Sequence, residues 1–149
     1  MMYDKNFIKS YSNRIKMNYD ELKSSKYGVT MLLCSFIGVM GVIDSDLRNT
    51  LFEEEDIPEY GELKINIVSE KDDNDVQAFF RHLRNSLCHL KIDESRISAE
   101  SSNISKIKLE DCSKGNIKKF EYDLNITDLE NLFYFIINKI TIKLEEEDK

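Results

Sequence analysis

The chain has 149 residues, the usual size of one domain, and we expect residues 1–149 to form a single domain. A hydrophobic content of 41%, with one proline and five glycines, excludes a wholly disordered chain. The formal net charge is −7, and residues 53–75 alone carry −8, with ten acidic side chains against two lysines. A globally basic, salt-driven nucleic-acid binder is therefore excluded, although a local cationic site is not.

Cysteine usage and hydropathy point to a cytoplasmic protein. Cys34, Cys88 and Cys112 show no paired spacing, which favours reduced thiols over a disulfide framework. The longest apolar stretch, Val29–Ile43, has 15 residues, and a membrane span needs about 20. The polar first ten residues do not resemble a secretory leader. We therefore expect a cytoplasmic protein with no membrane partner.

Two helices are predicted in the first part of the chain. Apolar residues recur at steps of three and four between about 3 and 26, which predicts an amphipathic helix. Its inward face is expected to consist of Phe7, Tyr11, Ile15, Tyr19 and Leu22. A second helix over about 29–43 is apolar nearly all round, so it should be the most buried one.

Residues 44–75 are predicted to form an acidic connector. A short helix is expected near 47–55, and Pro58 and Gly61 indicate a turn. The acidic run within the connector, 53–75, is expected to be a solvated loop. The alternative is that it faces a basic partner or keeps polyanions away from one side of the molecule.

In the second half of the chain the spacing of apolar residues changes twice, from helical to strand-like and back to helical. A third helix is predicted over about 74–90, after the cap-rich sequence "SEKDDND". Alternating apolar residues around the turn signal "SKGN" predict a β-hairpin over about 104–124. Thr127 and Glu130 form a capping-box pattern ahead of a fourth helix that runs to about 144. The expected fold is mainly α: an up-down four-helix bundle with the hairpin inserted between helices 3 and 4.

The third predicted helix has a distinct polar side. At about 100° per residue, one sector forms its core face: Val76, Phe79, Phe80, Leu83, Leu87 and Leu90. The other side carries Arg81, His82, Arg84, Asn85 and His89. Asn85 and His89 are four residues apart and can share a ligand. Arg84 and His89 are five apart, so they converge only if the arginine swings over, if the helix end unwinds, or if a second copy of the helix lies opposite. Spacing alone favours an ordinary solvated face that places His89 near a helix C-terminus.

The six residues "RNSLCH", 84–89, resemble the signature of the HEPN superfamily (higher eukaryotes and prokaryotes nucleotide-binding domains). That signature is an arginine, a polar residue and then a histidine, late in the third helix of a four-helix bundle. The sequence "MLLCSFIGVM" and the predicted hairpin are also similar to a small bacterial and plasmid-borne HEPN family. The resemblance implies a metal-independent endoribonuclease without a cofactor, often a toxin or an antiphage defence effector. It implies Arg84, Asn85 and His89 as catalytic residues and a homodimer as the working form.

These residue types suit RNA cleavage, because RNA carries its own nucleophile in the 2′-hydroxyl group. His89 can act as base or acid near neutral pH, and Arg84 can bind phosphate oxygens with two hydrogen bonds. Asn85 can orient either the imidazole or the phosphate. Arg81 and His82 are expected to bind substrate, and His82 is also a candidate for a second proton-transfer group. One histidine cannot easily serve both ends of an in-line displacement, which again favours a homodimer.

Other chemistries fit the sequence less well. His82 and His89 are two turns apart, about 10.5 Å in rise, which is too far for both to bind one metal ion. Two alternatives to a nuclease stay open. One is an inactive HEPN-like module that binds a nucleotide or a protein partner. The other is a helical interaction protein whose arginine and histidine pair within the molecule. For a HEPN protein, an antitoxin or a nucleotidyltransferase is a candidate partner.

Overall fold

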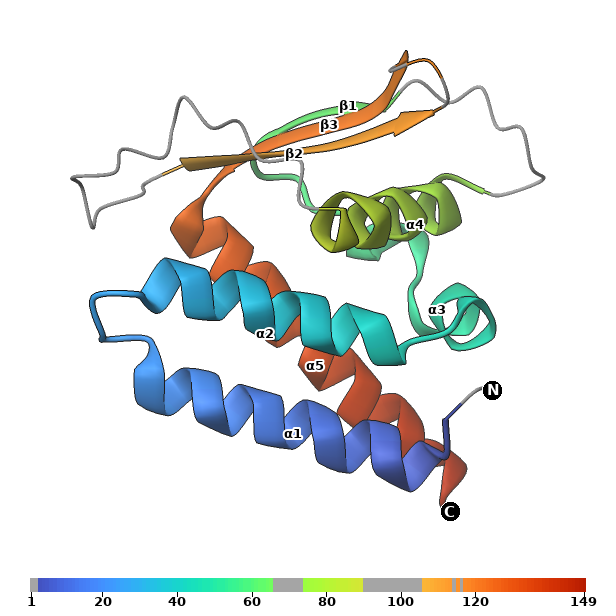
Figure 1. Cartoon of the computed structure of the whole chain (residues 1–149). Helices are drawn as coiled ribbons and strands as arrows, with labels where there is room; N and C mark the ends of the chain where they lie inside the picture. Colours follow the sequence, from blue (N-terminus) through green and yellow to red (C-terminus); the bar gives the residue numbers. More distant parts are fainter. Residues whose placement is uncertain (1–2, 66–73, 90–105, 114, 116) are drawn as a thin grey trace. The chain divides into compact units, whose positions relative to one another are not determined.

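The computed structural model describes residues 3–65, 74–89, 106–113, 115 and 117–149. Within these residues the protein is mainly helical, with five α-helices and one small antiparallel sheet of three strands (Figure 1). The chain divides into two compact units. We call residues 1–52 with 130–149 the helical unit, and residues 53–129 the sheet unit.

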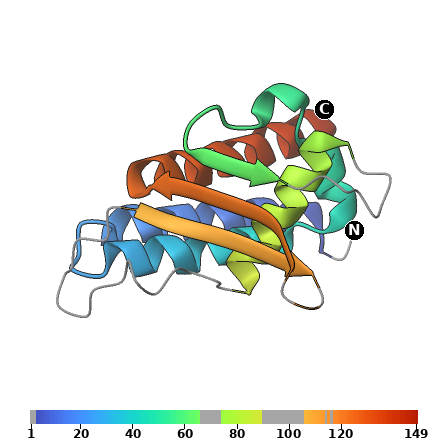
Figure 2. The ribbon, with the colours of Figure 1, turned by 90° about the horizontal axis from the view of Figure 1, so that it is seen from above.

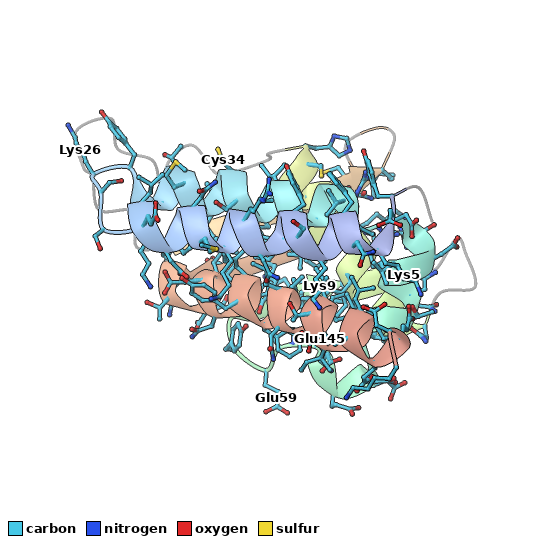
Figure 3. All side chains as sticks on the ribbon, turned by 90° about the horizontal axis from the view of Figure 1, so that it is seen from below. Lys5, Lys9, Lys26, Cys34, Glu59 and Glu145 are labelled. Carbon is cyan, nitrogen blue, oxygen red and sulfur yellow. The ribbon has the colours of Figure 1, made fainter. Side chains whose placement is uncertain are left out.

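The helical unit is built from α1 (Lys5–Leu22), α2 (Gly28–Val42), α3 (Ser45–Leu51) and most of α5 (Ile126–Glu147). A short turn joins α1 to α2, which runs back beside it (Figure 1). Helix α5 lies along α1, and Figure 3 shows Lys9 and Glu145 where the two helices meet. Three helices of this unit therefore share one apolar interior.

That interior follows the predicted pattern on α5, but on α1 it does so only at Tyr19. The α5 residues expected to face inward are all buried: Leu129, Leu132, Phe133, Ile136, Ile137, Ile140 and Leu144. On α1, however, the prediction was wrong for Phe7, Tyr11 and Leu22, which are exposed. The buried positions are Ile8, Ser12 and Tyr19. Steps of four residues drift by about 40° each on a helix, so a row of such steps leaves the core face within three turns.

Polar contacts join the rims of α1 and α5. The Tyr19 hydroxyl donates to the Glu130 carboxylate, and the Tyr134 hydroxyl donates to the Asp20 carboxylate. Burial, followed by the bond to the carboxylate, raises the pKa of both tyrosines well above the usual value. The hydrogen bond from Tyr134 in turn lowers the pKa of Asp20. These contacts hold the two helices in register beside the apolar core.

Helix α2 was predicted to be the most buried helix, and this was wrong: six of its 15 residues are buried against eight of 14 on α4, and Cys34 is exposed. Gly38 lies against α1, since a β-carbon there would come within 3.0 Å of Ile15 Cδ1 and 3.7 Å of Tyr11 Oη. Among the described residues no single helix has the length and apolarity of a membrane span, and the bent pair α2 and α3 passes on length and composition only.

The sheet unit places one helix on one face of its sheet. Strands β1 (Glu62–Ile65), β2 (Lys106–Ser113) and β3 (Ile117–Asn125) pair antiparallel in the order β1-β3-β2 (Figure 2). Helix α4 (Asp75–Cys88) crosses beneath these strands and packs against β2 (Figure 1). A 3-10 turn, η1 (Glu54–Asp56), precedes β1 and also touches α4.

The core of this unit confirms the predicted inward faces. All five residues expected to point inward from the two later strands are buried: Ile107, Leu109, Phe120, Tyr122 and Leu124. On α4 the predicted core residues Val76, Phe79, Phe80, Leu83 and Leu87 are buried as well, whereas Leu90 lies outside the described residues. The Phe79 ring meets the rings of Phe80, Phe120 and Tyr122 at centroid distances of 4.9 to 6.0 Å.

The connector is more ordered than the sequence predicted. Its helix begins at Ser45, after the Asp44 cap, and ends at Leu51, earlier than expected. Four residues of the connector form β1, which pairs with β3, so the sheet has three strands and not the two of a hairpin. Gly61 enters β1 with φ +80°, and the Tyr122 hydroxyl donates to the Tyr60 carbonyl, 2.8 Å away. Residues 66–73 of the connector lie outside the described residues.

Helix α5 begins with a different cap from the predicted capping box. The Asn125 side chain accepts from the backbone N–H of Asp128 at 2.7 Å, and Glu130 instead accepts from Tyr19. The prediction was wrong because the helix begins at Ile126, so Thr127 lies inside the first turn and Asn125 takes the cap position. The packing of α4 into one up-down bundle with α1, α2 and α5 stays a prediction.

Candidate functional site

The polar residues singled out in the sequence lie on α4, whose ends are both capped. Asn74 accepts from the N–H of Gln77 at 2.9 Å, and the Gln77 side chain accepts from the N–H of Asn74 at 3.3 Å, which completes a capping box. At the other end His89 is the C-cap, and its backbone N–H donates to the Asn85 carbonyl at 3.0 Å. Arg84 and Asn85 therefore lie on the last regular turn of a well-formed helix.

A carboxylate on β2 organises this turn. The Asp111 Oδ2 atom accepts from His82 Nδ1 at 2.8 Å and from Asn85 Nδ2 at 3.2 Å. The side chains of His82 and Asp111 are only 9% and 14% exposed. An ionised carboxylate has acceptors alone, so His82 donates through Nδ1 and keeps its second ring nitrogen, Nε2, for another role.

The network continues from Asn85 to Arg84. Asn85 Oδ1 accepts from Arg84 Nη1 at 3.1 Å, so the amide donates on one side and accepts on the other. Both residues are half-buried. No carboxylate of the described residues forms an ion pair with the Arg84 guanidinium. A neutral amide thus positions this cation, and its positive charge stays available for an anion.

His82 lies on the buried side of α4 and not on the solvated side that the helical wheel predicted. It is 7% exposed, and its ring stacks on Phe120 at a centroid distance of 5.6 Å and an interplanar angle of 15°. The prediction was wrong because the sheet covers a wider sector of α4 than its apolar residues mark. A role for His82 in binding substrate stays a prediction.

The remaining predicted site residues lie nearer to solvent. His89 is exposed, and Arg81 is half-buried and has an interaction partner of its own. The structure joins Arg84 to Asn85 by a side-chain hydrogen bond. Within the described part of the chain, the His89 imidazole makes no hydrogen bond to either residue. The arginine and the histidine of the signature thus occupy one helix end without contacting each other.

Asp111 was missed by sequence reasoning, although the sequence contains a signal for it. Ile107 and Leu109 point inward from β2, and Asp111 occupies the next position of the same alternation. A charged residue in an inward position requires a buried partner. Asp111 is paired in register with Phe120, the ring on which His82 stacks.

Potential metal ligands do not gather at this site or elsewhere in the residues described. Over those ranges, no group of three or more His, Cys, Asp or Glu side chains is arranged to hold a metal ion. The three cysteines have free thiols, and two of them, Cys88 and Cys112, are half-buried in the sheet unit.

Comparison with known proteins gives one result that covers nearly the whole chain. The family model described as HEPN pEK499 p136 matches residues 1–147. Neither the curated proteins nor the solved structures contain a match. The match spans the helix end with the arginine and histidine signature and the strand with Asp111. The chain belongs to the HEPN pEK499 p136 family.

Proposed function

We propose that this HEPN-family protein is a metal-independent endoribonuclease that cleaves RNA through attack by the 2′-hydroxyl group. Its catalytic residues are Arg84 and His89, and Asn85 orients the arginine. The observation that carries the proposal is the Arg84 guanidinium, which is fixed by Asn85 yet not neutralised by any described carboxylate, five residues before an exposed histidine. HEPN domains are often ribonucleases, which supports the same assignment.

Arg84 supplies the electrostatic part of the chemistry. The phosphate gains negative charge as the 2′-oxygen attacks and the 5′-oxygen begins to leave. A guanidinium can donate two parallel hydrogen bonds to the phosphate oxygens at this point. Because Asn85 already holds the guanidinium through Nη1, other N–H groups of Arg84 stay available to the substrate.

His89 supplies proton transfer from the exposed end of α4. Its imidazole can accept the proton of the 2′-hydroxyl or donate a proton to the leaving oxygen. One imidazole cannot easily do both at once. A homodimer that brings two copies of the α4 end together provides the second imidazole and the second guanidinium. In this proposal α1, α2, α4 and α5 form the up-down bundle of each subunit, and RNA lies in the cleft between subunits.

We place the enzyme in the cytoplasm, as a toxin or antiphage defence effector that a partner such as an antitoxin or nucleotidyltransferase restrains. Arg81 is a substrate-binding residue in this scheme, one turn before Asn85.

A second candidate function is a HEPN module that binds a nucleotide or a protein without cleaving RNA. The charge of the sheet unit favours it, since residues 53–129 hold 11 basic against 18 acidic side chains. Such a surface repels long polyanions and lowers the affinity for bare RNA.

Cleavage of RNA by the purified protein in excess EDTA distinguishes the two functions. Wild type is expected to leave 2′,3′-cyclic phosphate or 3′-phosphate ends. Arg84→Ala and His89→Ala should each lower the cleavage rate by about 100-fold or more, because each removes a group that acts in the transition state. Arg14→Ala is the matched control, since Arg14 is an exposed arginine on α1, outside the sheet unit.

Two results would contradict the assignment. Equal cleavage by wild type and by both site variants would refute the site. Binding of a nucleotide that depends on Arg84, with no cleavage of any RNA, would favour the second function.

A further inference from the structure

We propose that Asp111, on β2, is a positioning residue that sets the orientation of Arg84 through Asn85. The inference rests on the proposed nuclease function for its kinetic consequence, but its geometric content stands by itself. It makes the hairpin of β2 and β3 part of the site and not merely a cover for α4.

The orientation of the Asn85 amide carries the argument. Its Nδ2 donates to Asp111 Oδ2 at 3.2 Å, and its Oδ1 accepts from Arg84 Nη1 at 3.1 Å. Asp111 offers acceptors only, and the guanidinium offers donors only. If the amide were turned over, both contacts would become repulsive. The carboxylate on β2 therefore determines which amide atom faces Arg84.

Asp111 is itself held in place by its neighbours on α4 and β3. His82 Nδ1 donates to the same Oδ2 atom at 2.8 Å, and the His82 ring is fixed by stacking on Phe120. Phe120 is the cross-strand partner of Asp111 on β3. The carboxylate is 14% exposed, so water competes little for its oxygens. His82 therefore fixes the position of the Asp111 carboxylate.

A relay through a neutral amide also explains why the carboxylate does not cancel the arginine. A direct pair of Asp111 with Arg84 would neutralise the cation that the phosphate needs. Here the two hydrogen bonds to Oδ2 come from an imidazole and an amide. The negative charge is balanced by these donors, and the guanidinium keeps its charge.

The local structure of β2 places the carboxylate at this point. A register shift in the pairing of β2 with β3 falls between Asp111 and Cys112. Bulges of this kind change the direction of a strand and of its side chains, and they often occur beside functional sites. Asp111 is the last residue before the shift, so its side chain keeps the inward direction of Leu109.

A comparison of Asp111→Ala with Glu110→Ala tests the role. The two residues are neighbours on β2, but Glu110 pairs with Lys118 at 2.9 Å and is not part of the network. Asp111→Ala should lower kcat by about 10-fold or more with little change in KM, because a displaced arginine is misaligned for the transition state. Glu110→Ala should keep kcat within about 2-fold of wild type.

A double variant separates positioning from a general loss of structure. If Asp111 acts through Asn85, the double variant Asp111→Ala with Asn85→Ala should be no slower than Asn85→Ala alone. Asp111→Asn keeps the volume and one acceptor oxygen, so it should recover most of the lost rate even if Asp111→Ala folds poorly. The proposal would be overturned if the rate losses of the two single variants multiplied in the double variant. Full activity of a folded Asp111→Ala protein would overturn it as well.

NMR provides a readout that does not require nuclease activity. In 15N-labelled protein, Asp111→Ala should shift the Asn85 side-chain amide signals and speed rotation of the Arg84 guanidinium, and Glu110→Ala should change neither. Unchanged Asn85 and Arg84 signals in Asp111→Ala would refute the positioning role. A wild type that shows these contacts but cleaves no RNA would refute the proposed function and leave the positioning role supported.

Discussion

The helical unit and the sheet unit differ in where they keep their polar groups. In the helical unit two tyrosine–carboxylate contacts join α1 and α5: the bond from Tyr134 to Asp20 is exposed, and the bond from Tyr19 to Glu130 is half-buried. Its ten basic side chains equal its ten acidic ones. In the sheet unit His82 and Asp111 lie against the core, and the unit carries the entire net charge of −7.

This difference indicates what each unit contributes. An exposed contact such as that of Tyr134 with Asp20 costs little, because water solvates either group when it is left unpaired. Groups such as His82 and Asp111 carry a desolvation cost that only complete hydrogen bonding offsets. A fold gains little stability from such an arrangement, so its presence beside Arg84 is better explained by function than by folding.

The largest expected effects come from removing the central ring of each core. Phe79→Ala in the sheet unit and Phe133→Ala in the helical unit should each lower the free energy of unfolding by about 3–5 kcal/mol, because each ring is fully buried among other rings. Urea unfolding measures both. Under the proposed nuclease function, at a temperature where both variants are folded, only Phe79→Ala should slow RNA cleavage, because α4 then packs less firmly against the sheet.

The reverse pattern would break the comparison. If Phe133→Ala abolished cleavage while Phe79→Ala retained it, the site would depend on the helical unit and not on the sheet unit.

A smaller effect is expected at the entry to the sheet. Gly61→Ala should destabilise the protein by about 2 kcal/mol or more, because φ is +80° and a β-carbon would come within 2.6 Å of Tyr122 Cε1. Gly115→Ala is the control, since its φ is +83° but nothing lies within 4 Å of the added carbon. Thermal unfolding of the two variants gives the difference. Equal losses would mean that the added carbon is accommodated without strain against the Tyr122 ring and the Asp123 carbonyl, which would lie 2.6 and 2.9 Å from it.

At the start of α5, where the two units join, the cap should contribute about 1 kcal/mol. Asn125→Ala should lose this amount, because the N–H of Asp128 would lose its acceptor. Thr127→Ala should change stability by much less. Chemical denaturation of both variants distinguishes the observed cap from the capping box that the sequence predicted. A larger loss of stability for Thr127→Ala than for Asn125→Ala would support the predicted capping box instead.

The smallest effect concerns the rim of the helical unit and depends on pH. The hydrogen bond from Tyr134 lowers the pKa of Asp20 below 3.8 in the folded protein. A lowered pKa gives stability that is complete above the unfolded pKa and is lost as pH falls through the folded pKa. In urea unfolding, the free energy of unfolding of wild type should exceed that of Asp20→Asn by roughly 0.5 kcal/mol at pH 6, a small value because the pair is exposed. At pH 2 the two free energies should be almost equal. A difference that does not change with pH would show that the Asp20 charge is not involved.

Sequence periodicity predicted most of the fold, because apolar burial is what it reports. The inward residues of α5 and of β2 and β3 follow their patterns, and so do those of α4 apart from His82. The failures have two physical causes. On α1 a row of four-residue steps drifts away from the core face, so Phe7 and Tyr11 were misplaced. On α4 the sequence does not say how wide a sector the sheet covers, so His82 was misplaced.

The candidate site was predictable only in part for a similar reason. Arg84, Asn85 and His89 are close in sequence, so a local signature finds them. Asp111 lies 26 residues after Asn85, and only the pairing of α4 with β2 brings the two together. A strand whose inward alternation ends in an acid was the one available sign of this contact.

The register shift after Asp111 divides the hairpin into a part that tolerates length changes and a part that does not. Adding or deleting one residue among the four positions from Ile107 to Glu110 would turn the carboxylate to the opposite side of the sheet. Beyond the shift, around Gly115, the same change would leave Asp111 pointing at α4. Homologues of this family that vary in loop length should therefore do so at the tip of the hairpin, and insertion scanning should find an abrupt boundary of tolerance at Cys112.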